Sequence, residues 1–380
     1  MERIYLDYAA TAPMSQDTID AYAKGMQQYF GNASSIYTSG RDAQYELMQV
    51  RSVLAKSIGA EQDDIIFTSG GTESDNTAIL KVAESYKANG RHIITTAVEH
   101  KAVLEPMQYL EQQGFTVTYL PVNEYGHVTA EQVAKALTDE TILVSIMYGN
   151  NETGAINPIE AIGQILAEHQ AIFHTDAVQA YGTQTLDVNQ LGVDLLSVSA
   201  HKIGGPKGMG FLYARPHLKG IRLLLGGNQE LKRRAGTQNV PGAIAFKHAV
   251  LAHAPVKQSK QYRKLMAYFL EQLNENGVSF SINGVSDIQQ SLPHICNLHF
   301  PGILAEKLLI QLDLMGVEVA AGSACTAGNT DPSHVLIAMF GENSPQVTES
   351  LRFSIGAQTT ITQLEQVAVK VKQAIEKLRQ

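Results

Sequence analysis

Short apolar runs alternate with helical segments between residues 65 and 215 of this chain. Segments such as 74–88 and 158–169 carry the helical pattern, and they separate apolar runs that have the length of strands. Strand–helix–strand spacing is typical of βαβ units, whose strands are parallel and buried on both faces. The sequence therefore predicts an α/β fold with a mostly parallel, seven-stranded sheet. The candidate strands are 65–69, 92–97, 116–121, 141–148, 171–176, 195–200 and 210–214.

The pattern changes after about residue 255. A long amphipathic helix is expected at about 258–275, followed by short strands near 280 and at 295–300 and a helix at about 304–315. The segment 361–378 is expected to be a core-facing helix, because its apolar residues recur every three or four positions. We therefore expect a large domain over residues 15–255 and a smaller α+β domain formed by residues 1–14 and 256–380.

Composition argues against several classes of protein. Apolar residues make up 44% of the 380 residues, which is enough for a large core. The net charge of −8, from 29 basic and 37 acidic residues, argues against direct binding to nucleic acid. The sequence shows no signal peptide and no apolar run long enough for a membrane span. Because Cys296 and Cys325 are the only cysteines, we expect a reducing cytoplasm, no disulfide framework and no bound metal.

Small and polar residues follow several predicted strands, at the end where parallel sheets bind their ligands. The stretch "TSGGTESDN" (68–76) joins a strand to a helix through Gly70 and Gly71. Glycines let the backbone approach a ligand, the first amides of a helix attract an anion, and Thr72 adds a hydroxyl. The spacing is neither that of a Walker loop nor GxGxxG, and an ordinary helix cap explains the stretch equally well.

Four more side chains lie after strands. Asp176 closes the run "AIFHTD", where a carboxylate is costly unless it meets a cation or a donor; a surface turn is the alternative. Gln179 follows three residues later, where a turn could aim it into the same crevice. His100 follows another strand and has either a structural or a catalytic role. Lys202, in "SAHKIGGPKG" (199–208), is either a solvated residue over a turn or an amine held in a pocket.

As a set, these residues match what pyridoxal 5'-phosphate (PLP) requires from a protein. The phosphate needs amides and hydroxyls, the pyridine nitrogen needs a carboxylate, and the ring accepts an aromatic neighbour. The aldehyde needs a lysine for a Schiff base. Each signal is weak alone, but their order along the chain predicts a PLP enzyme.

The chain resembles the cysteine desulfurases, a group of class-V aminotransferases among the fold-type I PLP-dependent transferases. The resemblance covers nearly the whole chain and rests on many motifs in the same order. These motifs are "YLDYAATAP" (5–13), "FGNASSIYTSGR" (30–41), "TSGGTESDN", "EHKAV", "YGNNETGAI", "HTDAVQA", "SAHKIGGPKG", "RRAGTQN", "GSACT" and "LRFSIG". It implies a large PLP-binding domain and a small domain that carries a catalytic cysteine.

The resemblance implies roles around the cofactor ring. Lys202 would bind the aldehyde as a Schiff base, Asp176 would pair with the pyridine nitrogen, and Gln179 would bond the phenolic oxygen. His100 would stack on the ring and, with Lys202, carry protons as a catalytic residue. Asn151 would also border the cofactor.

The remaining implied roles concern the phosphate and the substrate. Gly71, Thr72, Ser199 and His201 would hold the phosphate. Thr237 would reach the phosphate of the neighbouring subunit, which implies a homodimer. Asn151 and Arg352 would bind the substrate carboxylate, for which the planar fork of an arginine is well suited.

Cys325 lies in "AAGSACTAG" (320–328), where no neighbour is larger than threonine. Such a segment cannot anchor itself by packing, so we expect a mobile loop; a small buried thiol is the alternative. The match to "GSACT" implies the catalytic thiol, and the spacing from Cys325 to Arg352 resembles the long-loop group of the family. Cys296, in the apolar pattern "HICNLHF", is expected only to pack.

The resemblance implies removal of sulfur from L-cysteine, which gives L-alanine and a persulfide on Cys325. The expected partner is a sulfur acceptor, either an iron–sulfur scaffold or a tRNA-thiolation enzyme. A selenocysteine lyase or a related class-V aminotransferase is the alternative with the same cofactor. A binding protein that keeps the fold without the chemistry is the alternative from another class.

Overall fold

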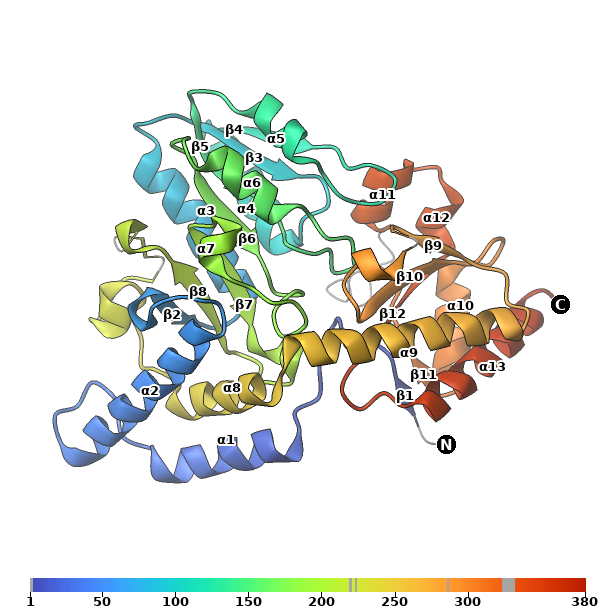
Figure 1. Cartoon of the computed structure of the whole chain (residues 1–380), viewed down its shortest axis with the longest axis horizontal. Helices are drawn as coiled ribbons and strands as arrows, with labels where there is room; N and C mark the ends of the chain where they lie inside the picture. The colour runs from blue at the N-terminus through green and yellow to red at the C-terminus, as the bar shows by residue number, and fades with distance from the viewer. Residues whose placement is uncertain (1–2, 219–220, 223, 286, 323–331) are drawn as a thin grey trace.

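The computed structural model describes residues 3–218, 221–222, 224–285, 287–322 and 332–380. Within these ranges, a seven-stranded sheet has the order β2-β8-β7-β6-β5-β3-β4 (Figure 1). Only β8 among these strands runs against its neighbours, since it pairs antiparallel with both β7 and β2. The predicted α/β fold with a mostly parallel sheet is confirmed. The strands are β2 (Ile65–Thr68), β3 (His92–Thr96), β4 (Thr116–Leu120), β5 (Thr141–Ser145), β6 (Ile172–Asp176), β7 (Leu195–Ser199) and β8 (Gly210–Ala214).

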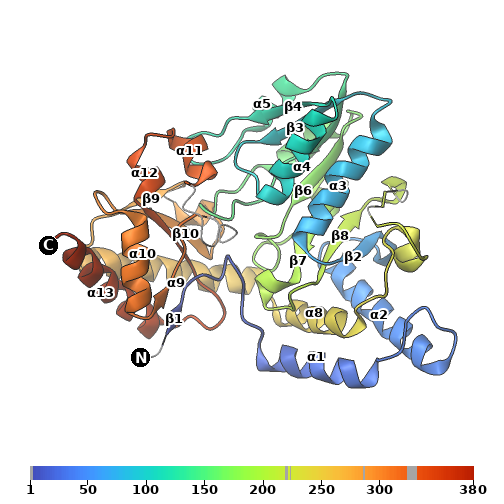
Figure 2. The same cartoon turned by 180° about the vertical axis from the view of Figure 1, so that it is seen from behind.

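Successive strand residues point into two different cores, one on each face of the sheet. In β6, Ile172 packs into the core under α3 (Gly71–Tyr86) and α4 (Lys101–Gln112), which Figure 2 shows in front of the sheet. Phe173 packs into the core on the opposite face. Burial on both faces explains why these strands are continuous apolar runs. The other helices of this part are α1 (Gln16–Gln28), α2 (Thr38–Lys56), α5 (Ala130–Ala136), α6 (Ile159–Leu166), α7 (Val188–Leu191) and α8 (Val240–Ala252).

A second, smaller part has its own core beside a three-stranded antiparallel sheet of order β12-β10-β9. The helix α13 contributes Leu364, Val367 and Val371 to this core, as its spacing predicts. The predicted domain limits at 14/15 and 255/256 stay a prediction. The elements are β9 (Ser281–Asn283), β10 (Ile295–His299), β12 (Ser350–Ser354), α9 (Pro255–Glu275), α10 (Ala305–Leu314), α11 (His334–Phe340), α12 (Pro345–Thr348) and α13 (Ile361–Leu378).

Local signals determine where two helices begin. At α13, Thr360 accepts from the Gln363 N–H at 3.2 Å, and the Gln363 side chain accepts from the Thr360 N–H at 3.0 Å. This capping box starts the helix at the predicted residue. In contrast, α3 starts at Gly71, three residues before the predicted position 74. Its N-cap, Gly70, makes no side-chain hydrogen bond, so no capping side chain marks this start in the sequence.

The N-terminal segment connects the two parts. The strand β1 (Ile4–Tyr5) pairs in parallel with β11 (Val317–Glu318) in the smaller part, and α1 lies under the larger part (Figure 1). The crossing residues between β1 and α1 thus pass between the two cores. None of the helices in the described ranges is long and apolar enough to cross a membrane.

Candidate active site

A cavity of about 300 Å³ lies where several strands of the central sheet end; we call it the strand-end cavity. It also receives residues from the N-terminal crossing and from β12, so both parts of the molecule form it. Ten of the residues predicted from the sequence border it, namely Gly71, Thr72, His100, Asn151, Asp176, Gln179, Ser199, His201, Lys202 and Arg352. The structure therefore brings together side chains that are up to 281 residues apart, from 71 to 352.

Lys202 is an amine inside a pocket and not a solvated residue over a turn. It lies in the 3₁₀ helix η2 (Ala200–Ile203), directly after β7. Its Nζ donates to the carbonyl oxygens of Ala9 at 2.6 Å and Ala10 at 3.0 Å. A Cβ on Gly205 would lie 2.9 Å from the Cβ of Ala200, so the glycine after the lysine allows the turn to close tightly.

Asp176 is a buried carboxylate at the end of β6. Its Oδ1 accepts from the Val178 N–H at 2.9 Å, and the described part of the chain shows no ion pair with it. Burial raises the pKa of Asp176, while the nearby His100 and Lys202 and the Val178 amide partly offset that effect. A cationic ring nitrogen would therefore supply the counter-charge that this carboxylate lacks.

The start of α3 provides a concave surface for an anion. A Cβ on Gly71 would lie 2.8 Å from Cγ2 of Val178, so only glycine leaves this corner open. A groove at this helix start is bordered by Gly71, Thr72, Ser199 and His201. The first amides of the 16-residue helix have no partner within the helix and are therefore available to an anion there. Nδ1 of His201 lies within hydrogen-bond distance of Thr11 Oγ1, at 3.2 Å, and burial lowers the pKa of His201 to about 4.

His100 is fixed as the N-cap of α4, where its Nδ1 accepts from the Ala102 N–H at 3.1 Å. The preceding residue, Glu99, is fully buried and accepts from the Met147 N–H at 3.0 Å with each carboxylate oxygen. Glu99 therefore ties the turn that carries His100 to the end of β5. This anchor is not evident in the sequence, because an acidic residue beside a histidine has no distinctive spacing.

Arg352 extends from β12 into the strand-end cavity and is only 1% exposed. Its Nη1 donates to the Asn151 carbonyl at 2.9 Å, and its Nη2 donates to Asp7 Oδ1 at 2.6 Å. Within the described residues, Nε has no hydrogen-bond partner. The guanidinium is thus held in place with N–H groups, among them that of Nε, still available for a carboxylate. No local sequence pattern links Asp7 to Arg352.

A second layer of buried polar groups lies under the cavity. Asp75 is 1% exposed, and its Oδ1 lies 3.5 Å from Nε2 of the fully buried His174. Burial, and then the nearby Asp176, raises the pKa of Asp75 well above its usual value, and burial lowers the pKa of His174 to about 3. Burial therefore favours the neutral form of both groups.

Thr237 and the two cysteines remain to be placed. Thr237 borders a separate cavity together with Ser69 and Gly208. Cys325 lies outside the described residues. Cys296 is buried in β10, and burial raises the pKa of its thiol to about 12, so it is an unreactive packing residue as predicted.

The residues around the cavity fit PLP. Asp176 is a buried carboxylate in need of a cation, Gly71 leaves an open corner at a helix start, and the Lys202 amine reaches the same space. Such a set offers a group for the ring nitrogen, a cradle for the phosphate and an amine for the aldehyde. The fold and the cavity together define a PLP-dependent enzyme of fold-type I.

Comparison with known proteins gives the family. Residues 4–367 match the sequence profile described as Aminotransferase class-V. The chain belongs to this family and, within it, groups with the cysteine desulfurases. A protein of Bacillus subtilis (strain 168) with the name "Putative cysteine desulfurase IscS 1" is 50% identical over 380 residues, which are 100% of each chain.

Solved structures agree with this assignment. A structure titled "NifS-like protein" superposes with a TM-score of 0.90 at 34% identity, over 99% of this chain and 100% of that one. Another, titled "SspA in complex with cysteine", has a TM-score of 0.82 at 33% identity and covers 92% of this chain and 98% of that one. The family predicted from the sequence motifs is confirmed.

Proposed function

We propose that this chain binds PLP and removes sulfur from L-cysteine, giving L-alanine and a persulfide on Cys325. The observation that carries this proposal is the meeting of Lys202, Asp176 and Arg352 in one cavity. An amine, a carboxylate for a ring nitrogen and a guanidinium for a substrate carboxylate are the groups that PLP chemistry on an amino acid requires. The names of the relatives support cysteine as that amino acid.

The proposed cofactor contacts follow the cavity walls. Lys202 would hold the aldehyde end, Asp176 the ring nitrogen and Gln179 the phenolic oxygen, with His100 against the ring. Gly71, Thr72, Ser199 and His201 would hold the phosphate at the start of α3. When bound, PLP withdraws electrons from an attached amino acid and so makes the proton on Cα more acidic.

The chain's own groups would then position the substrate and move its protons. Arg352, held by Asp7 and by the Asn151 carbonyl, would bind the carboxylate of L-cysteine. Asn151 would border the same carboxylate. Lys202 and His100 would exchange protons with the substrate, because both carry a group that can bind a proton and both border the cavity.

Sulfur transfer would use the Cys325 thiolate as nucleophile. The C–S bond of L-cysteine breaks, an S–S bond to Cys325 forms, and a proton replaces sulfur on the carbon. L-alanine and a persulfide result, and no external oxidant is needed.

The described residues that flank segment 323–331 support this role. Ser333 Oγ donates to Oε2 of Glu152, the residue after Asn151, at 2.5 Å. His334 Nε2 donates to the carbonyl of Glu99, the residue before His100, at 2.9 Å. On the other side, a Cβ on Gly322 would lie 3.9 Å from the same Glu152 oxygen. Both flanks therefore contact residues that are sequence neighbours of Asn151 and His100, which border the strand-end cavity.

We further propose a cytoplasmic homodimer whose sites are shared between subunits. Thr237 borders a cavity apart from the strand-end cavity of its own chain, which suits a residue that reaches the phosphate site of a neighbour. The proposed sulfur acceptor is an iron–sulfur scaffold protein or a tRNA-thiolation enzyme. Since selenocysteine would fit the same carboxylate and amine contacts, a selenocysteine lyase is the second candidate.

The experiment compares Cys325→Ser with Cys296→Ser after incubation with sulfur-labelled L-cysteine and no added thiol. We expect Cys325→Ser to bind cysteine, and to change the absorbance of bound PLP, but to retain no protein-bound label, because a hydroxyl cannot hold a persulfide. Cys296→Ser should keep the label. Label that persists on Cys325→Ser would overturn the choice of thiol. Faster release of alanine from selenocysteine than from cysteine would favour the lyase.

A further inference from the structure

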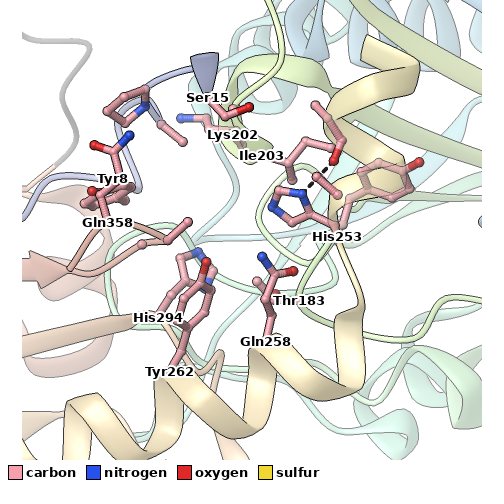
Figure 3. A pocket seen from close by; sticks show the side chains of 18 of the residues that line it. Tyr8, Ser15, Thr183, Lys202, Ile203, His253, Gln258, Tyr262, His294 and Gln358 are labelled. Atoms are coloured by element: carbon pink, nitrogen blue, oxygen red, sulfur yellow. Dashed lines mark hydrogen bonds between the residues drawn. The ribbon is translucent and has the colours of Figure 1, made fainter. Parts of the chain in front are cut away.

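A second cavity lies behind Lys202, on the opposite side of the wall formed by Val178, Gln179 and Lys202. Its volume is about 160 Å³, and it lies between the larger and the smaller part of the molecule. Figure 3 shows His294 and Tyr262 side by side in this cavity, with Lys202 at its far wall. Because Lys202 and Gln179 border both cavities, groups in the second cavity can act on the strand-end cavity through them.

His294 is a titratable residue of this cavity to which the proposed chemistry gives no role. It directly precedes the core strand β10, and it is 8% exposed. Its Nε2 lies 3.4 Å from Oε1 of Gln179, while within the described residues its Nδ1 has no hydrogen-bond partner. Burial, and then the charges of Lys202 and Arg352, lowers the pKa of His294 to about 3, so the imidazole is neutral at pH 7.

A neutral imidazole carries a single N–H group, and its surroundings select the tautomer. A proton on Nδ1 would leave a buried donor without an acceptor and would place the bare Nε2 against the Gln179 oxygen. A proton on Nε2 instead gives a hydrogen bond to that oxygen. The second arrangement avoids an unsatisfied buried donor, so Nε2 is the donor.

Gln179 is held at both ends of its amide by this arrangement. Its Nε2 donates to the Ala9 carbonyl at 3.0 Å, and the same carbonyl accepts from Lys202 Nζ at 2.6 Å. Rotating the Gln179 amide by half a turn would place its oxygen against the Ala9 carbonyl oxygen and its NH₂ group against the His294 N–H. Both contacts would be repulsive, so the amide orientation is fixed. One N–H of Gln179 is not used by these contacts, and Gln179 borders the strand-end cavity.

We propose that His294 is a positioning residue, which donates from Nε2 to Gln179 Oε1 and so directs the remaining Gln179 N–H toward the cofactor. This inference rests on the proposed binding of PLP and adds a residue of the smaller part to the cofactor site. It also connects the second cavity to Lys202, because Gln179 and Lys202 share the Ala9 carbonyl.

The test uses two variants of similar shape in the full-length protein. His294→Gln keeps a donor near the position of Nε2, whereas His294→Met replaces that end by an apolar group. PLP is removed from each purified protein, and its dissociation constant and absorbance maximum are measured on adding PLP back. A net hydrogen bond corresponds to a factor of roughly three to ten in affinity. We therefore expect His294→Met to bind PLP about threefold to tenfold more weakly, with a shifted absorbance maximum, and His294→Gln to resemble the wild type.

The same measurements in a Gln179→Ala background separate positioning from a general structural role. If His294 acts through Gln179, His294→Met should change PLP affinity by less than about twofold in that background. An equal loss with and without Gln179 would overturn the inference, as would wild-type affinity and absorbance in His294→Met. A wild-type protein that does not bind PLP would overturn the proposed function itself, which is a different result. Circular dichroism and urea unfolding test whether both variants are folded. If His294→Met does not fold, His294→Asn replaces it, because the shorter asparagine amide ends near the position of Nδ1 and does not reach that of Nε2.

Discussion

Replacing Glu99 by glutamine should stabilise the protein in a manner that depends on pH. Glu99 is fully buried, and burial raises the pKa of its carboxyl from 4.5 to about 8 despite hydrogen bonds from Met147 and Thr96. Glutamine keeps an acceptor for those two donors and cannot ionise. The variant therefore removes the titration while it preserves most of the local structure.

The sign follows from the direction of the pKa shift. The folded protein holds the Glu99 proton more tightly than the unfolded chain does, so its stability falls as the pH rises from about 4.5 toward 8. At about 1.4 kcal/mol per pH unit, the loss between pH 5 and pH 7 is about 2.5 kcal/mol. Glu99→Gln lacks this loss, so its free energy of unfolding relative to the wild type should increase by about 2.5 kcal/mol over that interval.

The assay is urea unfolding of the PLP-free wild type and variant at pH 5, 6, 7 and 8, at one protein concentration. Because both proteins share every other titrating group, the difference between them isolates Glu99. Glu105→Gln, the same substitution at an exposed residue of the next helix, is the matched control for a change outside the core. A difference between Glu99→Gln and the wild type that stays constant within about 0.5 kcal/mol would refute the reasoning, since it would mean that Glu99 ionises normally when buried.

Three further predictions concern catalysis. Asp176→Asn should lower turnover at least tenfold with little change in cysteine binding, and steady-state rates within about threefold of wild type, or about 0.7 kcal/mol, would contradict the ring-nitrogen role. Arg352→Lys should raise KM for cysteine about tenfold, because lysine cannot contact Asp7 and a substrate carboxylate in the same forked geometry; an unchanged KM would argue for another carboxylate site. Mixing Lys202→Ala with Thr237→Ala under subunit exchange should produce activity above that of either parent, since one site of the mixed dimer carries neither defect, and no gain despite proven exchange would count against shared sites.

The strands, and the residues that follow them at the ligand-binding edge of the sheet, could be predicted because the sequence patterns that indicate them are local. Burial on both faces makes each strand a short apolar run, and ligand-binding residues follow such runs in parallel sheets. Lys202, Asp176 and His100 were predicted in this way, and all three border the strand-end cavity. The order of the strands was not predictable, and neither was the reversal of β8, which is set by pairing with both β7 and β2.

The partners that hold the site residues were missed for a different reason. Asp7 lies 345 residues from Arg352, and His294 lies 115 residues from Gln179, so no local pattern links them. The two carbonyls that accept from Lys202 belong to alanines, whose side chains carry no chemical signal. Contacts of this kind are visible only once the fold has brought the segments together.

The N-terminal crossing has a consequence for the order in which the molecule can be completed during synthesis. Ile4 pairs with Val317, and Arg352 must be present before Asp7 can reach its partner. At about 5–20 residues per second, a ribosome needs roughly 15–60 s to make the 313 residues that separate the two paired strands. During that time the first segment emerges without its partner strand, and the backbone oxygens of Ala9 and Ala10 are not yet fixed around the lysine. A nascent chain that has already folded its central sheet therefore lacks the fixed carbonyl oxygens that hold the Lys202 amine until β12, which binds Ala9 through Ser354, has left the ribosome.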